Sequence, residues 1–368
     1  DVDAAALYVV SLLGLNQGDR EPVAYARAAD LAESLFVKFP NHPGAAHYLI
    51  HAVDDPDHAR RGLAAARAYS AIAPSAGHAL HMTSHIFLAM GMWDDVARAN
   101  DEAMATIKRA VGHSVQFSVY GLLQAGRRRD ARRWLDSLAT QRSSSLEAVR
   151  EDSKVHLGLT IPAYLAETKE WKSGYVSMLG DTTSSISGGV GEALFGDALA
   201  AVSRGKRDRA DSLLARLIAL RSLASTRKLA SASDIGNHEV REKTLRAMML
   251  RADRKPEEAV RLLRFAAEQE AALPMDFGPP VSIEPPREAA GEILLALGRA
   301  AEARAEFLLA LARAPGRSAV LLGLARAEKA LGNRAEAARR YGEVAANWHA
   351  ADGDWPALAE VRAGAAAH

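Results

Sequence analysis

Cysteine is absent from the 368 residues, and aromatic residues make up only 6% of them. Without thiols the chain cannot form disulfides, hold zinc or an iron–sulfur cluster through cysteine, or use a cysteine nucleophile. The hydrophobic share is nevertheless 49%, and alanine, leucine and valine supply most of it. Such residues favour closely packed helices. The composition therefore predicts an all-α protein.

The chain also lacks an excess of either charge and any long apolar run. It has 46 lysines and arginines against 45 aspartates and glutamates, a formal net charge of +1, which gives no general attraction to nucleic acid or anionic lipid. No apolar run approaches the ~20 residues that cross a bilayer. We expect no nucleic-acid partner and no membrane span. Because the chain begins at Asp1 instead of methionine, we also expect a processed or trimmed form.

Amphipathic segments of ~12 to 18 residues alternate with short breakers such as "AMGMWDD", "QAGRRRD", "RADRKPEE", "ALGRAAE" and "ALGNRAE". In the last two units, Ala303 and Phe307 recur as Ala337 and Tyr341. This period, about 34 residues, is typical of tetratricopeptide repeats. The small, aromatic and proline positions of that repeat are matched by Gly291, Ala303, Phe307, Ala310 and Pro315. The chain resembles this class, which implies a right-handed α-solenoid of about eight helical hairpins.

Two segments interrupt the repeats. The stretch "MLGDTTSSISGGVG" (178–191) has no helical character and divides the chain into an N-terminal half, residues 1–180, and a C-terminal half, residues 181–368, which continues the same solenoid. The stretch "MDFGPPVSIEPP" (275–286) contains four prolines, which make it a stiff extended loop. Loops of this kind often line functional sites.

Histidines follow the repeat. His47 and His51 lie one such period before His81 and His85, so the two pairs occupy equal positions of consecutive units, and His78 extends the second pair. Residues four apart share one helix face. The resemblance to tetratricopeptide arrays implies that this face lines the concave groove of the solenoid.

Imidazoles on neighbouring helices, ~8 to 10 Å apart, can meet between them. Neutral imidazole binds divalent zinc, copper and iron. The sequence therefore predicts a transition-metal site, and its ligands are His47, His51, His78, His81 and His85. Neither pair carries the glutamate of a zincin metalloprotease motif, so we exclude that class. We interpret the isolated His113, His156 and His349 as ordinary polar groups.

Three polar residues are candidates to support these ligands. Asp54 and Asp55 follow His51 by about one turn and are expected either to orient imidazoles or to form a helix-ending turn. Asn100 occupies the place that Phe307 and Tyr341 take in the regular units. It either hydrogen-bonds beneath the histidines or is a packing compromise.

Two glutamates repeat the histidine register in the C-terminal half. Glu288 and Glu292 precede Ala303 at the same two spacings by which His81 and His85 precede Val96. If the solenoid curls on itself, they face the histidines as metal ligands, as a general base or as a clamp for a cation. The alternative is a pair of solvated glutamates.

The blocks "HYLIHAVDDP" and "HMTSHIFLAMGMWDD", with the tail from "FGPPVSIEPP" onward, resemble an uncharacterised and often exported family of bacterial tetratricopeptide proteins. The resemblance marks the five histidines, Glu288 and Glu292 as signature positions and implies an exported location, with a cytoplasmic one as the alternative. It names no reaction. This chain has Thr83 where the family usually has proline.

Two functions are compatible with these observations. The first is a metal-binding protein, either an enzyme or not, in which Glu288 or Glu292 handles protons. The alternative is a non-catalytic scaffold whose groove holds a peptide, a protein or a small molecule, with the histidines supplying hydrogen bonds.

Overall fold

The computed structural model describes residues 1–14, 20–179, 189–275 and 278–366. Most of the predicted linker (178–191) and part of the proline loop (275–286) therefore lie outside the described residues. Throughout the described part the regular structure is helical, without a strand, which confirms the all-α prediction. No described helix is both long and apolar enough to cross a bilayer.

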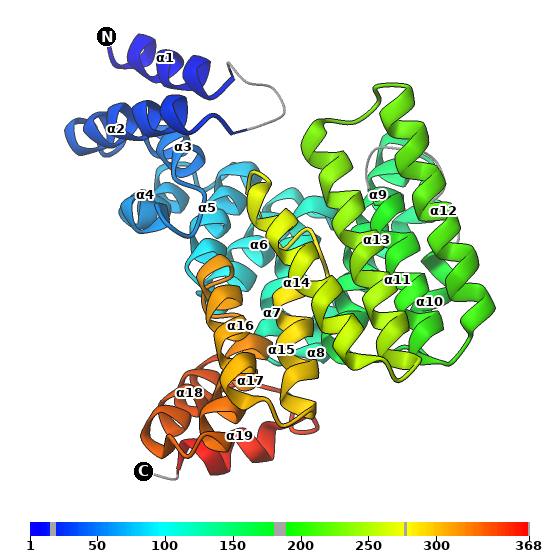
Figure 1. Cartoon of the computed structure of the whole chain (residues 1–368). Coiled ribbons are helices and arrows are strands. Elements are labelled where there is room, and N and C mark those ends of the chain that lie inside the picture. Colours follow the sequence, from blue (N-terminus) through cyan, green and yellow to red (C-terminus); the bar gives the residue numbers. More distant parts are fainter. Residues whose placement is uncertain (15–19, 180–188, 276–277, 367–368) are drawn as a thin grey trace.

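Eight helical hairpins follow one another in the described part of the chain, and α9 (Glu147–Thr168) with the short α10 (Tyr175–Met178) lies between the fourth and the fifth. The first four are α1 (Val2–Gly14) with α2 (Pro22–Lys38), α3 (Pro43–Ala52) with α4 (Ala59–Ile72), α5 (Gly77–Ala89) with α6 (Trp93–Ile107), and α7 (Gly112–Gln124) with α8 (Arg128–Thr140). The other four are α11 (Val190–Ser203) with α12 (Arg207–Thr226), α13 (Ala232–Ala252) with α14 (Pro256–Ala272), α15 (Pro286–Ala296) with α16 (Ala300–Arg313), and α17 (Ser318–Ala330) with α18 (Arg334–Asn347). Helix α19 (Leu358–Ala365) ends the array, as Figure 1 shows.

The turn within most hairpins is made by one residue in the left-handed conformation. The glycines at these turns are Gly91, Gly126, Gly205, Gly298 and Gly332, each with φ between 66° and 79°. A left-handed residue after the last helical turn lets following amides bond back to free carbonyls and so ends the helix. The "AMGMWDD", "QAGRRRD", "ALGRAAE" and "ALGNRAE" segments are thus the turns that the sequence predicted.

Small residues let adjacent hairpins pack around an aromatic ring. Phe307 of α16 is fully buried, and a Cβ placed on Gly291 or on Gly323 would lie 2.7 or 2.4 Å from its ring atoms. Helices α15 and α17 therefore enclose the ring from two sides, as the tetratricopeptide pattern requires.

We expect Gly323→Ala to lower the thermal midpoint of unfolding. Overpacking a filled core costs about 1–3 kcal/mol, and Phe307 cannot yield toward Gly291; the ~1 kcal/mol that alanine contributes to a helix offsets only part of this. Gly342→Ala in α18, where an added Cβ meets nothing within 4 Å, is the matched control and should be neutral or stabilising. Equal midpoints for the two variants, measured by calorimetry, would contradict this packing.

The C-terminal hairpins return to the N-terminal half. Gln124, at the end of α7, accepts hydrogen bonds at its backbone carbonyl from Ser318 Oγ (2.7 Å) and Trp348 Nε1 (3.0 Å). Gly126 accepts a further bond from the Asp352 amide. In Figure 1 the orange α16 lies beside the cyan helices, and Trp93 Nε1 of α6 donates to the Gly316 carbonyl just after α16. The solenoid curls on itself and closes.

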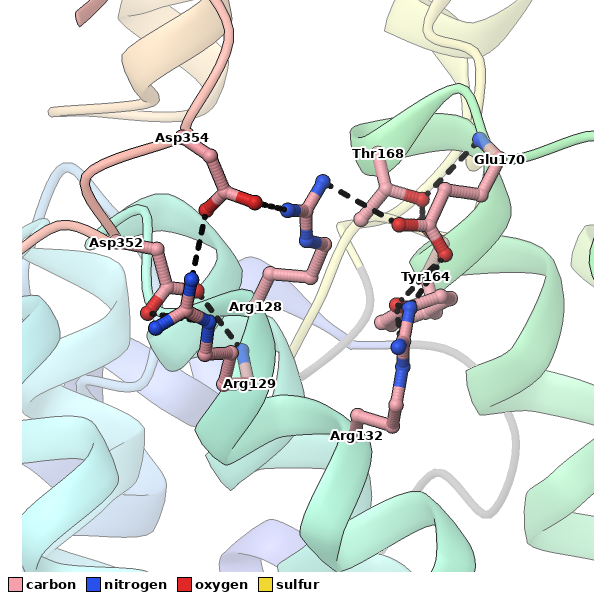
Figure 2. A network of polar contacts seen from close by, with 8 residues as sticks. All are labelled: Arg128, Arg129, Arg132, Tyr164, Thr168, Glu170, Asp352 and Asp354. Atoms are coloured by element: carbon pink, nitrogen blue, oxygen red, sulfur yellow. Dashed lines mark hydrogen bonds and ion pairs between the residues drawn. The ribbon is translucent and has the colours of Figure 1, made fainter.

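Charged side chains continue this closure at the surface. Figure 2 shows Arg128 and Arg129, at the start of α8, reaching Asp354, with Arg128 also 3.3 Å from Glu170. The Arg129 amide donates to the Asp352 carboxylate. Exposed ion pairs of this kind each contribute about 0–1 kcal/mol, so they fix the register of the closure more than its strength.

A buried network joins the two halves below that surface. Arg317 Nη1 lies 2.5 Å from Glu167 of α9 and donates to Tyr120 Oη of α7, while Arg317 Nε and Nη2 donate to Glu288 of α15 at 2.5 and 3.1 Å. Only 3% of Arg317 is exposed. A single guanidinium therefore balances two largely buried carboxylates across the closure.

Candidate metal centre

Imidazoles from four consecutive first helices form a continuous row. The row runs from α3 through α5 and α7 to α9, with ring centroids 4.7–6.5 Å apart between neighbours. Its members are His47, His51, His78, His81, His85, His113 and His156. The apolar residues beside them on the same helices, such as Leu49, Ile50, Met82 and Ile86, are buried in the core. The imidazoles and these apolar residues thus occupy different positions of the helix register.

His81 and His85 lie at the centre of the row and are almost fully buried, with 4% and 5% exposed. His81 Nδ1 is 2.6 Å from Asn100 Oδ1, and Asn100 Nδ2 donates to the Val96 carbonyl at 2.8 Å. This second bond fixes the orientation of the amide, so its oxygen faces His81 and accepts the Nδ1 proton.

His85 is oriented by a carboxylate. Its Nδ1 is 2.6 Å from Asp54 Oδ2, and Asp54 is itself buried with 3% exposed. Since a carboxylate accepts, His85 carries its proton on Nδ1 as well. Hydrogen bonds of this kind fix the tautomer and ring orientation of metal-binding histidines.

The two Nε2 atoms consequently face each other as acceptors. His81 Nε2 and His85 Nε2 are 3.1 Å apart. When both rings are neutral with their protons on Nδ1, both Nε2 atoms carry lone pairs, and this approach is favourable only if a cation or an added proton lies beside them. Two nitrogens at this separation, each about 2.0–2.1 Å from one zinc ion, would subtend roughly 100° at the metal.

His113 completes a group of three. The nitrogens of His81, His85 and His113 all lie within 4.8 Å of one another, and His113 is exposed. His113 is therefore not isolated, as we had interpreted it to be, because its ring lies 4.7 Å from that of His81. Phe117 contacts all three rings. The sequence did contain a signal for this contact. His113 and Phe117 follow His81 and His85 by slightly less than one repeat period, because their unit is two residues shorter than that period.

The remaining predicted ligands form the other end of the row. His47 lies between His51 and His78, at 4.8 and 5.1 Å between ring centroids, and stacks on Tyr69. Its Nε2 is buried and makes no hydrogen bond among the described residues. Leaving a buried ring nitrogen without a hydrogen-bond partner costs free energy.

The predicted supporting residues separate into two roles. Asp54 and Asn100 hydrogen-bond to the central histidines, so Asn100 has a polar role in its aromatic slot. Asp55 instead accepts from the backbone amides of Asp57 and His58 and pairs with Arg20 at 3.3 Å. Asp55 thus forms the helix-ending turn that we considered as its alternative.

The two predicted glutamates lie elsewhere. Glu288 is held by Arg317 in the buried network, and Glu292 lines a separate cavity with Lys169, Glu284 and Arg251. Their polar contacts among the described residues include none of the histidines. A role for either carboxylate in proton transfer stays a prediction without a supporting contact.

Desolvation keeps four histidines of the row neutral. Desolvation, with the neighbouring imidazoles adding to it, lowers the pKa of His47 to about 3, that of His81 to about 2 and those of His51 and His113 to about 4. The ordinary pKa is about 6.5. Neutral imidazoles with free lone pairs are the form that binds a metal.

The metal-free protein should therefore lose stability on acidification. Because these folded-state pKa values lie below the unfolded value, the unfolded chain binds more protons as pH falls below about 6.5, and unfolding becomes easier until the folded pKa values, from about 4 down to about 2, are passed. We expect the thermal midpoint after chelation to fall steadily from about pH 7 to about pH 4.5, and His47→Gln to reduce the slope. A midpoint that stays constant or rises over this interval would contradict the buried neutral row.

The hairpins and their repeat signature define a tetratricopeptide-like helical-repeat protein. No family model and no curated protein matches the chain. Among solved structures it is similar to the human IFIT1 dimer with m7Gppp-AAAA (15% identity, 96% of this chain and 73% of that chain, TM-score 0.44) and to yeast Tom70 (12%, 100% and 92%, TM-score 0.40). It is also similar to the TPR domain of P58(IPK), with 14% identity, 99% and 96% coverage and a TM-score of 0.30.

Proposed function

We propose that the chain binds a divalent transition metal through His81, His85 and His113. The observation that carries this proposal is the 3.1 Å approach of two Nε2 atoms whose Nδ1 protons are both committed, to Asn100 and Asp54. Within the described part of the chain, no third side chain hydrogen-bonds to either of these Nε2 atoms. A metal ion bound to both lone pairs removes the repulsion and uses the orientation that the two hydrogen bonds impose.

The donor set indicates the kind of ion. Three neutral imidazoles without thiolate suit zinc, copper(II) or iron(II). Three histidines leave a fourth coordination position for water or a substrate, which is the arrangement of catalytic and not of structural zinc sites. His113 is the exposed member and the one that adjusts when the ion binds, since ligands of a tetrahedral zinc ion are about 3.3 Å apart.

His47, His51 and His78 supply a second, weaker site. The unpartnered His47 Nε2 supports it, and the exposed His78 lies between the two groups. The histidine blocks that resemble exported bacterial tetratricopeptide proteins fit a location where such an ion is acquired outside the cytoplasm. We propose the second site and the exported location together with the central site.

Metal titration tests the proposal. The untagged protein, stripped with a chelator and dialysed, is titrated with zinc, copper(II) and, under anaerobic conditions, iron(II) in a calorimeter. We expect about one tight equivalent and a second, weaker one, with a rise in thermal midpoint on loading. Absence of saturable binding by all three ions at micromolar protein would refute the proposal.

Removing the carboxylate that orients His85 should weaken binding without removing a ligand. Asp54→Asn keeps the shape of the side chain but not its charge, and loss of such a supporting group typically costs about 10–100-fold in metal affinity. Asp57→Asn, an exposed change on the same turn, is the matched control and should leave the affinity unchanged. An Asp54→Asn protein with wild-type affinity would show that the carboxylate does not support the metal.

A further inference from the structure

A cavity lies where the C-terminal hairpins close against the N-terminal half, and Asp54 forms part of its wall. Its apolar lining is made by Leu88, Trp93, Met275, Pro279, Val281 and Leu309. The space open to the centre of a water molecule is about 110 Å³, several times the ~10–15 Å³ that one water needs. Closure of the solenoid thus creates a chamber large enough for a small organic molecule.

Most charged groups around this cavity are already matched. Arg317 holds Glu288, Arg287 donates to Glu306 at 2.8 Å, and Asp55 pairs with Arg20. These pairs leave no charge of their own free for a ligand.

Two opposite charges on the cavity wall form no direct ion pair within the described part of the chain. Glu270, in the last turn of α14, and Arg313, the last residue of α16, both line the cavity, and neither side chain makes a hydrogen bond or an ion pair within the described part of the chain. Burial raises the pKa of Glu270, and the positive charges of Arg313, Arg287 and Arg241 only partly oppose this. The Asn237 amide lines the same cavity, also without a hydrogen bond among the described residues.

We propose that this cavity binds a free amino acid with an apolar side chain. The ammonium group pairs with Glu270, the carboxylate pairs with Arg313 and accepts from the Asn237 amide, and the side chain lies among Trp93, Leu309 and Val281. A zwitterion matches one free acid and one free base, whereas a simple anion or cation would satisfy one and leave the other unpaired in an apolar enclosure. The proposal is independent of the metal site.

Calorimetric titration with leucine, methionine and phenylalanine tests this site, on chelated and on zinc-loaded protein. The decisive ligands are two analogues of leucine: 4-methylpentanoate, which lacks the ammonium group, and 3-methylbutan-1-amine, which lacks the carboxylate. Since a charge-assisted hydrogen bond contributes roughly tenfold or more in affinity, we expect each analogue to bind at least about tenfold more weakly than leucine. Binding should be retained in chelated protein, so failure of the metal proposal leaves this test intact.

Variants assign the two charges. Arg313→Ala should weaken leucine and 4-methylpentanoate by about tenfold and leave the amine unchanged, while Glu270→Gln should weaken leucine and the amine and leave the acid unchanged. Arg216→Ala, an exposed arginine on α12, is the matched control, and circular dichroism checks that each variant folds. The proposal is overturned by absence of leucine binding at millimolar concentration, by equal affinity of leucine and its analogues, or by binding that both variants leave intact.

Discussion

A protein carrying both His81→Ala and His85→Ala should bind zinc or copper(II) at the central site at least about 100-fold more weakly than the wild type. Loss of a supporting group alone costs about 10–100-fold, and this double change removes two of three ligands. Because both residues are buried, the thermal midpoint of the chelated variant is measured beside its affinity. Calorimetric titration of each ion is the measurement.

The matched control removes two histidines outside the row. His58 and His349 are exposed, and their polar contacts lie with Asp55 and Asp94 instead of the seven imidazoles. The His58→Ala, His349→Ala protein should keep the affinity and stoichiometry of the wild type. If the two double variants bind metal equally well, adventitious coordination by surface histidines is the better explanation.

Arg317→Met should be among the most destabilising single changes in the chain. It leaves Glu167 and Glu288 buried without their cation, and breaking one side of a buried ion pair costs about 3–5 kcal/mol. The thermal midpoint should fall accordingly. Arg339→Ala removes an exposed guanidinium that pairs with Glu336 and Glu343, and it should cost about 0–1 kcal/mol.

A triple variant separates lost charge balance from lost packing. With Glu167→Gln and Glu288→Gln added to Arg317→Met, the network keeps no uncompensated buried charge, so part of the stability should return. A triple variant that unfolds at a lower temperature than the Arg317→Met protein would show that packing, not charge, governs this position. If the Arg317→Met protein is no less stable than the Arg339→Ala protein, the buried network does not stabilise the closure.

The hairpins could be predicted because their signals are local. Apolar residues that recur about every 3.6 positions predict a helix, and a glycine in the left-handed conformation ends it. The "ALGRAAE" and "ALGNRAE" segments could therefore be predicted as turns from their own residues. The regular spacing of Phe307 and Tyr341 reports nearest-neighbour stacking, which is the main interaction in a solenoid. The same repeat spacing predicted that His47 and His51 lie next to His81 and His85.

The central site was only partly predictable. His113 escaped because its unit is slightly short, so a search at one fixed period passes over it. Asn100 could be identified as unusual, since it replaces an aromatic residue, but two interpretations remained until its bond to His81 was seen. Which of two adjacent aspartates contacts a histidine of the site depends on where the chain turns: Asp54 bonds to His85, and Asp55 bonds to its own turn.

Closure of the solenoid could not be predicted from spacing. The contacts of Gln124 with Ser318 and Trp348 join positions very far apart in the chain, and their formation depends on small rotations summed over many hairpins. For that reason the predicted meeting of Glu288 and Glu292 with the histidines had no local basis. The curl occurs, but it brings Glu288 to Arg317.

Anomalous diffraction from a zinc-soaked crystal tests the central claim most directly. Data recorded on both sides of the zinc absorption edge should give a peak about 2.0–2.1 Å from His81 Nε2 and from His85 Nε2, with His113 as the third ligand. No peak should appear there in the His81→Ala, His85→Ala protein. Ordered zinc found only at surface residues, with the 3.1 Å approach of the two Nε2 atoms unchanged, would contradict the account.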